Sequence, residues 1–286
     1  MTARFDYHRP ATLEEAWRIA SSTPNARFVA GGTDVMVRVR EGKVRPSALV
    51  SLARVAELAK VDAGPPIAIG AGVKVADLEG HAPIARALPV MLLAARTLGS
   101  VQIRNAATVG GNLCNASPCA DLAPPLLVHD ARVRLVSASG ARELPLADFF
   151  TGPRSSVLAP GEILAAVVVG EPTKNTRATF LKKGRVAMDI AIASVAVLLE
   201  LDGARCTKAR VAAGSLGPTP MRLLGVEKAL EGRDVDDRAI AEARAAAERD
   251  VRPISDVRAG ADYRRHIAGV FVERCVRSLL EGGTRR

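Results

Sequence analysis

The first 55 residues alternate short apolar runs with one amphipathic stretch. Residues 26–30 and 48–52 are apolar runs of strand length. Between the chain start and these runs, Thr12 is followed three residues later by Glu15, which is the spacing of a capping box, and helical spacing continues from there. The pattern predicts a small α/β lobe over residues 1 to about 55, with a loop at the end of a strand.

A second lobe is predicted over residues 56–172, because strand-like and helix-like patterns cluster there without an internal repeat. Some of its apolar runs are punctuated by glycine, as in buried strands, and one segment alternates polar and apolar residues. The expected strands are 66–73, 132–137 and 161–169, and the expected helices are 89–98 and 122–129.

The composition turns polar near residues 170–175, which is where a domain boundary is predicted. We therefore expect a first domain at 1–172 and a second at 173–286. In the second, Asp202-Gly203 separates two apolar runs, which is a strong signal for a hairpin. Helical patterns then cover Leu223–Leu230, Arg238–Arg249 and Tyr263–Leu280, so the domain reads as an antiparallel sheet backed by helices, an α+β unit.

Cysteine usage and hydropathy limit the compartment and the cofactors that the chain can hold. The four cysteines show neither C-x-x-C nor His/Cys spacing, so we expect a reducing compartment, no metal site and no iron–sulfur cluster on this chain. The first residues carry no signal-peptide pattern, and no window reaches the roughly 18 uninterrupted apolar residues of a membrane span. The sequence predicts a cytoplasmic protein without a membrane span.

The formal net charge of +10 raises the question of nucleic acid. Aromatic residues make up only 3% of the chain, the basic residues are scattered, and no nucleic-acid-binding motif is present, so this class is disfavoured. The densest basic cluster follows the first strand–loop unit. It is best interpreted as a solvated face, with attraction of an anionic cofactor as the alternative; its members are Arg38, Arg40, Lys43 and Arg45.

Two Gly-Gly segments carry the candidate chemistry. One runs from Arg27 to Asp34 and the other from Thr108 to Asp121, and in each the glycine pair follows a short apolar or β-branched run. Paired glycines let a ligand approach the main chain, and consecutive N–H groups form an anion-binding concavity, which suits a diphosphate. Neither segment matches the dinucleotide-binding or P-loop patterns, and one Gly-Gly pair alone is more often an ordinary turn.

Together these segments resemble the FAD-binding loops of the medium, flavoprotein subunit of molybdenum hydroxylases, the family of xanthine dehydrogenase and aerobic carbon monoxide dehydrogenase. The resemblance rests on Ala30-Gly-Gly-Thr-Asp34, Thr108-Val-Gly-Gly-Asn112 and Ala116-Ser-Pro-Cys-Ala-Asp121, and continues through Lys182–Ala196, Gly214–Pro220 and Asp262–His266. It covers nearly the whole chain in the family's order. It implies an α+β fold: a two-lobed FAD-binding domain, of the type shared with vanillyl-alcohol oxidase-like flavoproteins, followed by a C-terminal antiparallel sheet with helices.

The resemblance also implies which residues meet FAD. The two loops would wrap the diphosphate with main-chain N–H groups, and Asp121 would accept from ribityl or ribose hydroxyls, although a helix N-cap is the alternative role for this residue. Either Lys182 or Lys183 would approach the flavin and stabilise its reduced anionic form. The implied binding residues are Arg27, Phe28, Val29, Ala30, Gly31, Gly32, Thr33, Asp34, Leu98, Thr108, Gly110, Gly111, Asn112, Asp121, Leu164 and Lys182, with Asp189 and Ile190 as flavin neighbours.

The first functional hypothesis is an FAD-binding electron-transfer subunit of a heteromeric molybdenum hydroxylase. By resemblance, a large partner carries the molybdopterin cofactor, a small partner carries two [2Fe-2S] clusters, and FAD passes electrons to NAD+, a quinone or another acceptor. A dimer of heterotrimers is implied. Thr33-Asp34 is nearer to xanthine dehydrogenase-like members than to the carbon monoxide type, but the substrate is chosen by the large partner.

Two alternatives remain open at the level of sequence. One is a self-contained FAD-dependent reductase or oxidase of the same fold, such as a reductase resembling those of cell-wall precursor synthesis. It would need its own substrate site with a proton donor, and no recognisable arrangement of this kind occurs in the C-terminal half. The other is a nucleotide-binding module without catalysis that keeps the loops as structure.

Overall fold

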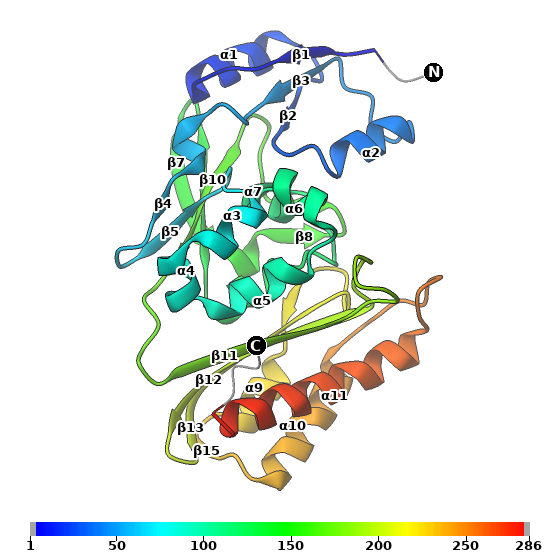
Figure 1. Ribbon diagram of the computed structural model, residues 1–286. Coiled ribbons are helices and arrows are strands. Elements are labelled where there is room, and N and C mark those ends of the chain that lie inside the picture. Colours follow the sequence, from blue (N-terminus) through cyan, green and yellow to red (C-terminus); the bar gives the residue numbers. More distant parts are fainter. Residues whose placement is uncertain (1–3, 283–286) are drawn as a thin grey trace.

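The computed structural model describes residues 4–282, and its N-terminal lobe is built on a small parallel sheet (Figure 1). Helix α1 connects the first two strands, and α2 leads from the second strand to the third. The strands pair in the order β1-β3-β2. The elements are β1 (Asp6–His8), α1 (Leu13–Ser22), β2 (Arg27–Val29), α2 (Val35–Arg40) and β3 (Ala48–Ser51).

The predicted capping box begins α1. The Thr12 hydroxyl accepts a hydrogen bond from the backbone N–H of Glu15 at 3.2 Å, which satisfies one of the unpaired donors of the first turn. The Glu15 carboxylate reaches back one residue further than the motif requires and accepts from the N–H of Ala11 at 3.0 Å. The prediction of this helix start is confirmed.

The second lobe is a five-stranded antiparallel sheet in the order β4-β5-β10-β6-β7. Short helices pack on one side of this sheet, and a small hairpin projects beside them (Figure 1). The strands are β4 (Val61–Asp62), β5 (Ile67–Gly70), β6 (Arg132–Ser137), β7 (Gly140–Pro145), β8 (Phe150–Gly152), β9 (Ser155–Ser156) and β10 (Ile163–Val169). The helices are η1 (Ala56–Ala59), α3 (Val75–Gly80), α4 (Ala82–Ala87), α5 (Pro89–Thr97), α6 (Val101–Ala106), α7 (Val109–Cys114), α8 (Ala123–Val128) and η2 (Leu146–Asp148).

After residues 170–175 the chain enters an antiparallel sheet in the order β11-β12-β13-β14, with β15 also pairing with β13. The predicted hairpin is confirmed: Asp202 pairs with Arg205, and Gly203 takes a φ of 60° in the turn. The elements are β11 (Thr176–Lys183), β12 (Ala193–Asp202), β13 (Arg205–Gly214), β14 (Met221–Arg222), α9 (Leu224–Leu230), β15 (Arg233–Asp234), α10 (Asp237–Asp250) and α11 (Ala261–Leu280). The outermost residues of the two predicted domains, 1–3 and 283–286, lie outside the described residues.

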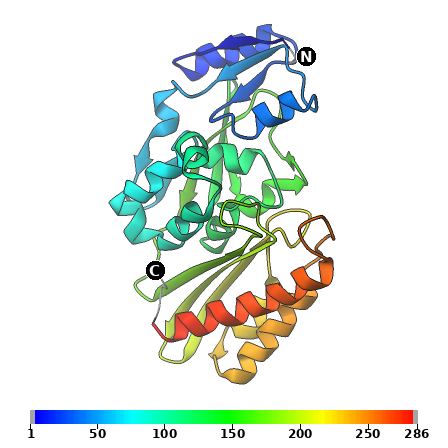
Figure 2. The same ribbon diagram turned by 45° about the vertical axis from the view of Figure 1, so that its right-hand side comes forward.

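Both faces of the C-terminal sheet are buried, because alternate residues of its strands enter two different cores. On β12, Ala196 and Leu198 join the core of the second lobe, whereas Val195 and Val197 join a core made with the helices. Figure 2 shows α10 and α11 covering the sheet face that is turned away from the second lobe. The sheet is therefore the layer that holds the second lobe and the helices α10 and α11 together, and the α+β class is confirmed.

An ion-pair cluster just after the C-terminal end of α8 joins the second lobe to the C-terminal sheet. Asp130, just after that helix, accepts hydrogen bonds from Arg222 at 2.6 Å and from Arg210 at 3.1 Å, and Arg222 also pairs with Glu227 of α9. Burial by itself raises the pKa of Asp130, but the two guanidinium groups more than offset this and hold it below its ordinary value. The carboxylate stays ionised and links the second lobe to strands β13 and β14.

The longest helix among residues 4–282 is too polar to serve as a membrane span, and each of the other helices is either too short or too polar for that role.

Candidate functional site

The first Gly-Gly segment lies against the main chain that directly precedes the second. A Cβ atom added to Gly31 would sit 1.9 Å from the carbonyl oxygen of Ala106 and 2.6 Å from its carbonyl carbon. Ala106 ends α6, two residues before Thr108. The absence of a side chain at Gly31 is therefore what allows the loop of the first lobe to close on the loop of the second.

The first segment forms an open turn after β2. Gly32 takes a φ of 72°, a conformation that glycine adopts without strain. Within residues 4–282, the backbone N–H groups of Gly31, Gly32 and Thr33 have no hydrogen-bond acceptor. Consecutive free N–H groups at the end of a strand form a concavity that binds anions.

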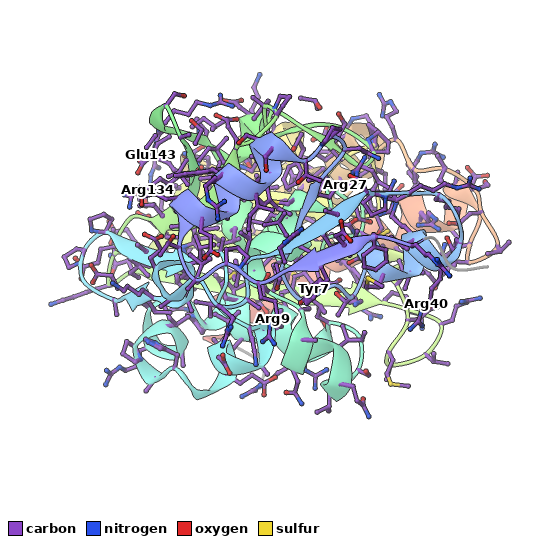
Figure 3. The ribbon with its side chains drawn as sticks, turned by 90° about the horizontal axis from the view of Figure 1, so that it is seen from above. Tyr7, Arg9, Arg27, Arg40, Arg134 and Glu143 are labelled. Carbon is purple, nitrogen blue, oxygen red and sulfur yellow. The ribbon has the colours of Figure 1, made fainter. Side chains whose placement is uncertain are left out.

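The neighbours of this turn take different positions. Val29 is buried, and Phe28 packs against a small core with Trp17. Arg27 is exposed on the outer face of the first lobe, the face that Figure 3 views, together with Tyr7. Ala30, Thr33 and Asp34 follow the strand into the turn, and Asp34 precedes α2 without a side-chain cap bond. The main chain of the turn, rather than the Arg27 side chain, forms the concavity.

The second segment differs from the prediction. Residues 109–112 are not an open loop but the start of helix α7, capped by the Thr108 hydroxyl, which accepts from the N–H of Gly111 at 3.0 Å. The N–H groups of Val109, Gly110 and Asn112 also donate within the chain, to main-chain oxygens at 2.8–3.0 Å. Each main-chain N–H of residues 109–112 therefore already has an acceptor within the chain, and the contact of this segment with a diphosphate stays a prediction. The carbonyl oxygens of residues 71 and 73 accept from two of these N–H groups, and the Thr108 hydroxyl accepts from a third.

The second segment still gives a ligand close access. A Cβ atom on Gly110 would lie 2.4 Å from that of Ala71, so this glycine is required for packing, whereas Gly111 is half-buried and presents bare main chain. The Asn112 side-chain oxygen accepts from the N–H of Leu122 at 3.3 Å, which ties α7 to the segment carrying Asp121. The amide NH2 of Asn112 keeps its donors unpaired within residues 4–282.

A buried ion pair closes the site on the side of the C-terminal domain. The ammonium of Lys182 donates to Asp121 at 2.7 Å and to the carbonyl oxygen of Thr97 at 2.9 Å. The two charged side chains are only 5% and 10% exposed, respectively. Strand β11 alternates its side chains, so Lys182 points inward and Lys183 is exposed. Between the two lysines, the geometry selects Lys182 as the one inside the site.

One of the two carboxylate oxygens of Asp121 has no hydrogen-bond donor within the described chain. This oxygen, Oδ1, is buried. Asp121 is not the N-cap of α8, because that position belongs to Leu122 and has no side-chain cap bond. Burial raises the pKa of Asp121, and the adjacent Lys182 opposes the rise. A buried acceptor without a donor is costly, so the oxygen suits a hydroxyl donor from a ligand.

Two apolar residues implied by the resemblance lie in the core. Leu98 follows α5 and is 7% exposed, and Leu164 of β10 is 3% exposed, next to a bulge in the strand. The Leu98 carbonyl accepts from Arg104 at 3.2 Å. Their side chains are packed as other core leucines are, and their role beside a cofactor stays a prediction.

The loop between β11 and β12 is exposed and carries Asp189. Its carboxylate accepts from Arg185 at 2.5 and 3.3 Å and from the N–H of Ile190 at 2.9 Å. The hydrogen bond from Arg185 holds the pKa of Asp189 down at about 2. Ile190 is 49% exposed and Met188 is 64% exposed. The loop therefore presents apolar side chains beside a fixed carboxylate.

Substituting Arg185 with glutamine is expected to return the pKa of Asp189 toward its ordinary value of 3.8. A carboxylate whose folded pKa lies below the unfolded value contributes stability above the unfolded pKa and loses it as the pH falls through the folded pKa. In the wild type that loss lies between about pH 4 and pH 2. Carboxyl-carbon NMR titration of aspartate-labelled protein measures the shift. Arg265→Gln, which removes the partner of Asp262, is the control and leaves Asp189 unchanged.

Several residues at the site escape sequence patterns. The Thr97 carbonyl has no motif that marks it, and Arg185 is marked only by its place in the resembling stretch Lys182–Ala196. Ser215 has a φ of 63° and donates its N–H to the Pro118 carbonyl at 2.7 Å, which joins the end of β13 to the segment that leads to Asp121. Ser215 is marked in the sequence only by its place in the resembling stretch Gly214–Pro220.

The amino-acid sequence matches two family profiles. "FAD binding domain in molybdopterin dehydrogenase" matches residues 3–172, and "CO dehydrogenase flavoprotein C-terminal domain" matches residues 178–279. The chain belongs to the flavoprotein family of molybdopterin dehydrogenases. It is thus a flavoprotein subunit of the oxidoreductase class.

The similarity extends over the whole flavoprotein subunit. This chain is 31% identical over 274 residues to the xanthine dehydrogenase FAD-binding subunit of Escherichia coli O157:H7, and the match covers 94% of each chain. It is 30% identical over 274 residues to the carbon monoxide dehydrogenase medium chain of Afipia carboxidovorans, covering 95% of each. The reconstituted CO dehydrogenase from Oligotropha carboxidovorans contains a chain with a TM-score of 0.93 and 30% identity, covering 97% of this chain and 98% of that one.

The residues of the flavoprotein subunit fit FAD. Free N–H groups at residues 31–33 suit a diphosphate, and the unpartnered Oδ1 of Asp121 suits a hydroxyl of the ribityl or ribose group. The subunit's four cysteines are free, and no cluster of three or more His, Cys, Asp or Glu side chains that could hold a metal ion occurs between residues 4 and 282.

Proposed function

We propose that this flavoprotein subunit is the electron-transfer component of a heteromeric molybdenum hydroxylase. It takes electrons from [2Fe-2S] clusters of a small partner subunit and passes them to NAD+ or another acceptor. The observation that carries the proposal is the pairing of an open N–H concavity at Gly31–Thr33 with a buried, unpartnered acceptor on Asp121. These are complementary to the two polar parts of FAD, its diphosphate and its hydroxyl-bearing chain.

Each residue has a defined task in the proposal. The N–H groups of Gly31, Gly32 and Thr33 donate to the diphosphate, and the Thr33 hydroxyl adds a donor. Gly111 and Asn112 contribute close main-chain approach and an amide from the second lobe. When bound, FAD supplies the redox chemistry, and the chain supplies binding, orientation and electrostatics.

Asp121 and Lys182 provide the hydrogen-bond acceptor and the positive charge for the cofactor. Asp121 accepts from a cofactor hydroxyl through Oδ1 while Lys182 holds its other oxygen. The buried Lys182 ammonium is a fixed positive charge that favours the reduced, anionic state of a nearby flavin over the neutral oxidised state. Asp189 and Ile190 are placed beside the ring, with Leu98 and Leu164 as apolar wall.

The partners are inferred from the names of relatives. Several are medium chains, such as the carbon monoxide dehydrogenase medium chain and the nicotine 6-hydroxylase medium subunit, which supports a small iron–sulfur partner and a large molybdopterin partner here as well. We place the assembly, a dimer of heterotrimers, in the cytoplasm, because all four cysteines of this chain are free. The large partner determines the substrate.

The test is to isolate the chain with its bound partners from its native source and to record the visible spectrum. We expect flavin and iron–sulfur absorption together, with one smaller and one larger subunit identified by mass. Flavin without partners, together with turnover of NAD(P)H by the lone chain, would instead support a self-contained reductase. A partner-bound chain without flavin would contradict the assignment of the two Gly-Gly segments.

A further inference from the structure

The stretch 262–266 near the start of α11 has no task in the proposed function, yet it contains the most deeply buried arginine side chain among the ion pairs of the described chain. Arg264 is 2% exposed. One Nη donates to the carbonyl oxygen of Ile192 at 2.7 Å and to that of Ser215 at 3.3 Å, and the other donates to Asp256 at 2.7 Å. Burying a guanidinium is costly unless its donors are paired. Both Nη atoms of Arg264 are paired, whereas its buried Nε has no partner within the described chain.

The first contact of Arg264 fixes the base of the loop that carries Asp189. The N–H of Ile192 donates to the carbonyl oxygen of Lys183 at 2.7 Å, which closes the loop 184–191 at its two ends. The Arg264 guanidinium donates to the carbonyl oxygen of the same residue, Ile192. The loop tip carries exposed apolar side chains and has few buried contacts, so its direction depends on how this base is held.

The second contact reaches the other wall of the site. Ser215, whose carbonyl Arg264 holds, donates its own N–H to Pro118 at 2.7 Å, three residues before Asp121. A Cβ atom on the preceding Gly214 would lie 2.6 Å from the Ser194 hydroxyl, so the packing at this strand end allows little adjustment. One guanidinium thus connects the loop 184–191 with the segment 116–121.

The third contact pairs the guanidinium with the carboxylate of Asp256. Asp256 lies in the segment before α11, where its carboxylate also holds Arg258. Arg185, the partner of Asp189, also interacts electrostatically with Asp256. Arg264 therefore contacts the segment that carries Asp256 and, through the Ile192 carbonyl oxygen, the base of the loop that carries Asp189.

We propose that Arg264 is a positioning residue that sets the loop 184–191 and the segment 116–121 relative to each other around the flavin ring. The inference rests on the proposed function, in which Asp189, Ile190 and Asp121 lie near the cofactor. Arg264 touches neither the N–H concavity at 31–33 nor the Lys182 ammonium, so it acts on the ring end of the site and not on the diphosphate end.

The test compares Arg264→Lys and Arg264→Met in the purified complex. A lysine keeps the charge but cannot make three contacts in a fixed fork. Both variants are expected to keep FAD, with an affinity within about twofold of wild type, because the diphosphate cradle is untouched. Both are expected to change the visible circular dichroism of the bound flavin and to shift its midpoint potential.

Two matched variants complete the design. Asp256→Asn weakens one of the three contacts while leaving the buried arginine in place, and it is expected to change the flavin spectrum in the same direction, by less. It also keeps the test informative where an Arg264 variant fails to fold. Arg277→Gln lies on the same helix and removes pairs to Asp237 and Glu273 on the exposed side, so it is expected to leave the flavin signals unchanged.

Three outcomes would overturn the assignment. Unchanged flavin dichroism and potential in all Arg264 and Asp256 variants would exclude a positioning role. Full recovery by Arg264→Lys alone would show that the charge matters and the fork does not. Loss of FAD from a folded Arg264 variant would place the residue in the binding machinery. Failure of the proposed function itself is distinct, because isolation of the wild-type chain would then yield either no flavin or no partner subunits.

Discussion

Replacing Gly31 with alanine is expected to weaken FAD binding by at least about 100-fold, corresponding to about 2.8 kcal/mol. The new Cβ atom would lie 1.9 Å from the carbonyl oxygen of Ala106, and a main-chain atom cannot move aside as a flexible side chain can. The first loop must then separate from α6, which turns its free N–H groups away from their shared ligand. The measurement is FAD content after purification, followed by titration with free FAD.

The control for this substitution is Gly80→Ala. Gly80 ends α3, and no atom lies within 4 Å of a Cβ atom built there. The control is expected to bind FAD as the wild type does. Wild-type affinity in the Gly31 variant would mean that the contact between the two loops is not needed for the cofactor. The proposed cradle would then be misplaced.

Replacing Lys182 with methionine is expected to destabilise the folded chain by about 3–5 kcal/mol, because it leaves a buried carboxylate without its counter-ion. Asp121 is only 10% exposed on its side chain, and its other oxygen has no partner within the described chain to compensate. Urea unfolding monitored by far-UV circular dichroism measures the change. Lys183→Met on the same strand, at an exposed position, is the control and is expected to be nearly neutral.

The loss in Lys182→Met is expected to depend on pH. Burial already raises the pKa of Asp121 in the folded chain, and without Lys182 nothing opposes that rise. When the folded pKa lies above the unfolded value, the folded state holds its proton more tightly, so stability falls as the pH rises from the unfolded pKa to the folded pKa. The variant should therefore lose least in mild acid and most at neutral pH. A loss independent of pH would contradict a buried carboxylate as its cause.

The double substitution Asp121→Asn with Lys182→Met separates charge from packing. Removing both charges eliminates the unpaired buried ion, so part of the stability lost in Lys182→Met is expected to return. The same double variant would still lack an ionised acceptor for the cofactor hydroxyl. Recovered stability with weakened FAD binding would assign the pair to both fold and site.

Helices and hairpins with strong local signals were predictable. Helix α11 has a long apolar periodicity, and Asp202-Gly203 is a turn that needs no tertiary information. Strand β11 was missed because one of its faces meets the second lobe and the other contains polar residues, so its alternation is weak. Helix α7 was read as a loop because glycine disfavours helices, whereas the Thr108 cap and the bonds to residues 71 and 73 override that preference.

The site was predictable in its parts but not in its connections. The Gly-Gly segments and Asp121 carry local patterns, and the resemblance supplied Lys182. The bond between Asp121 and Lys182 joins residues 61 positions apart, and no local pattern encodes such a distance. The same holds for Arg264, since a buried arginine and an exposed one look alike in a helical pattern. Tertiary packing decides these positions.

The ion pair of Lys182 and Asp121 limits which chimaeric chains can be built from the halves of two relatives. The FAD-binding region contributes the carboxylate and the C-terminal region contributes the ammonium, so neither half of the site is complete on its own. A chimaera that takes its halves from two relatives must inherit a matching pair at both positions, together with the link from Asp130 to Arg222. The two regions match separate family profiles but are coupled to each other by these ion pairs.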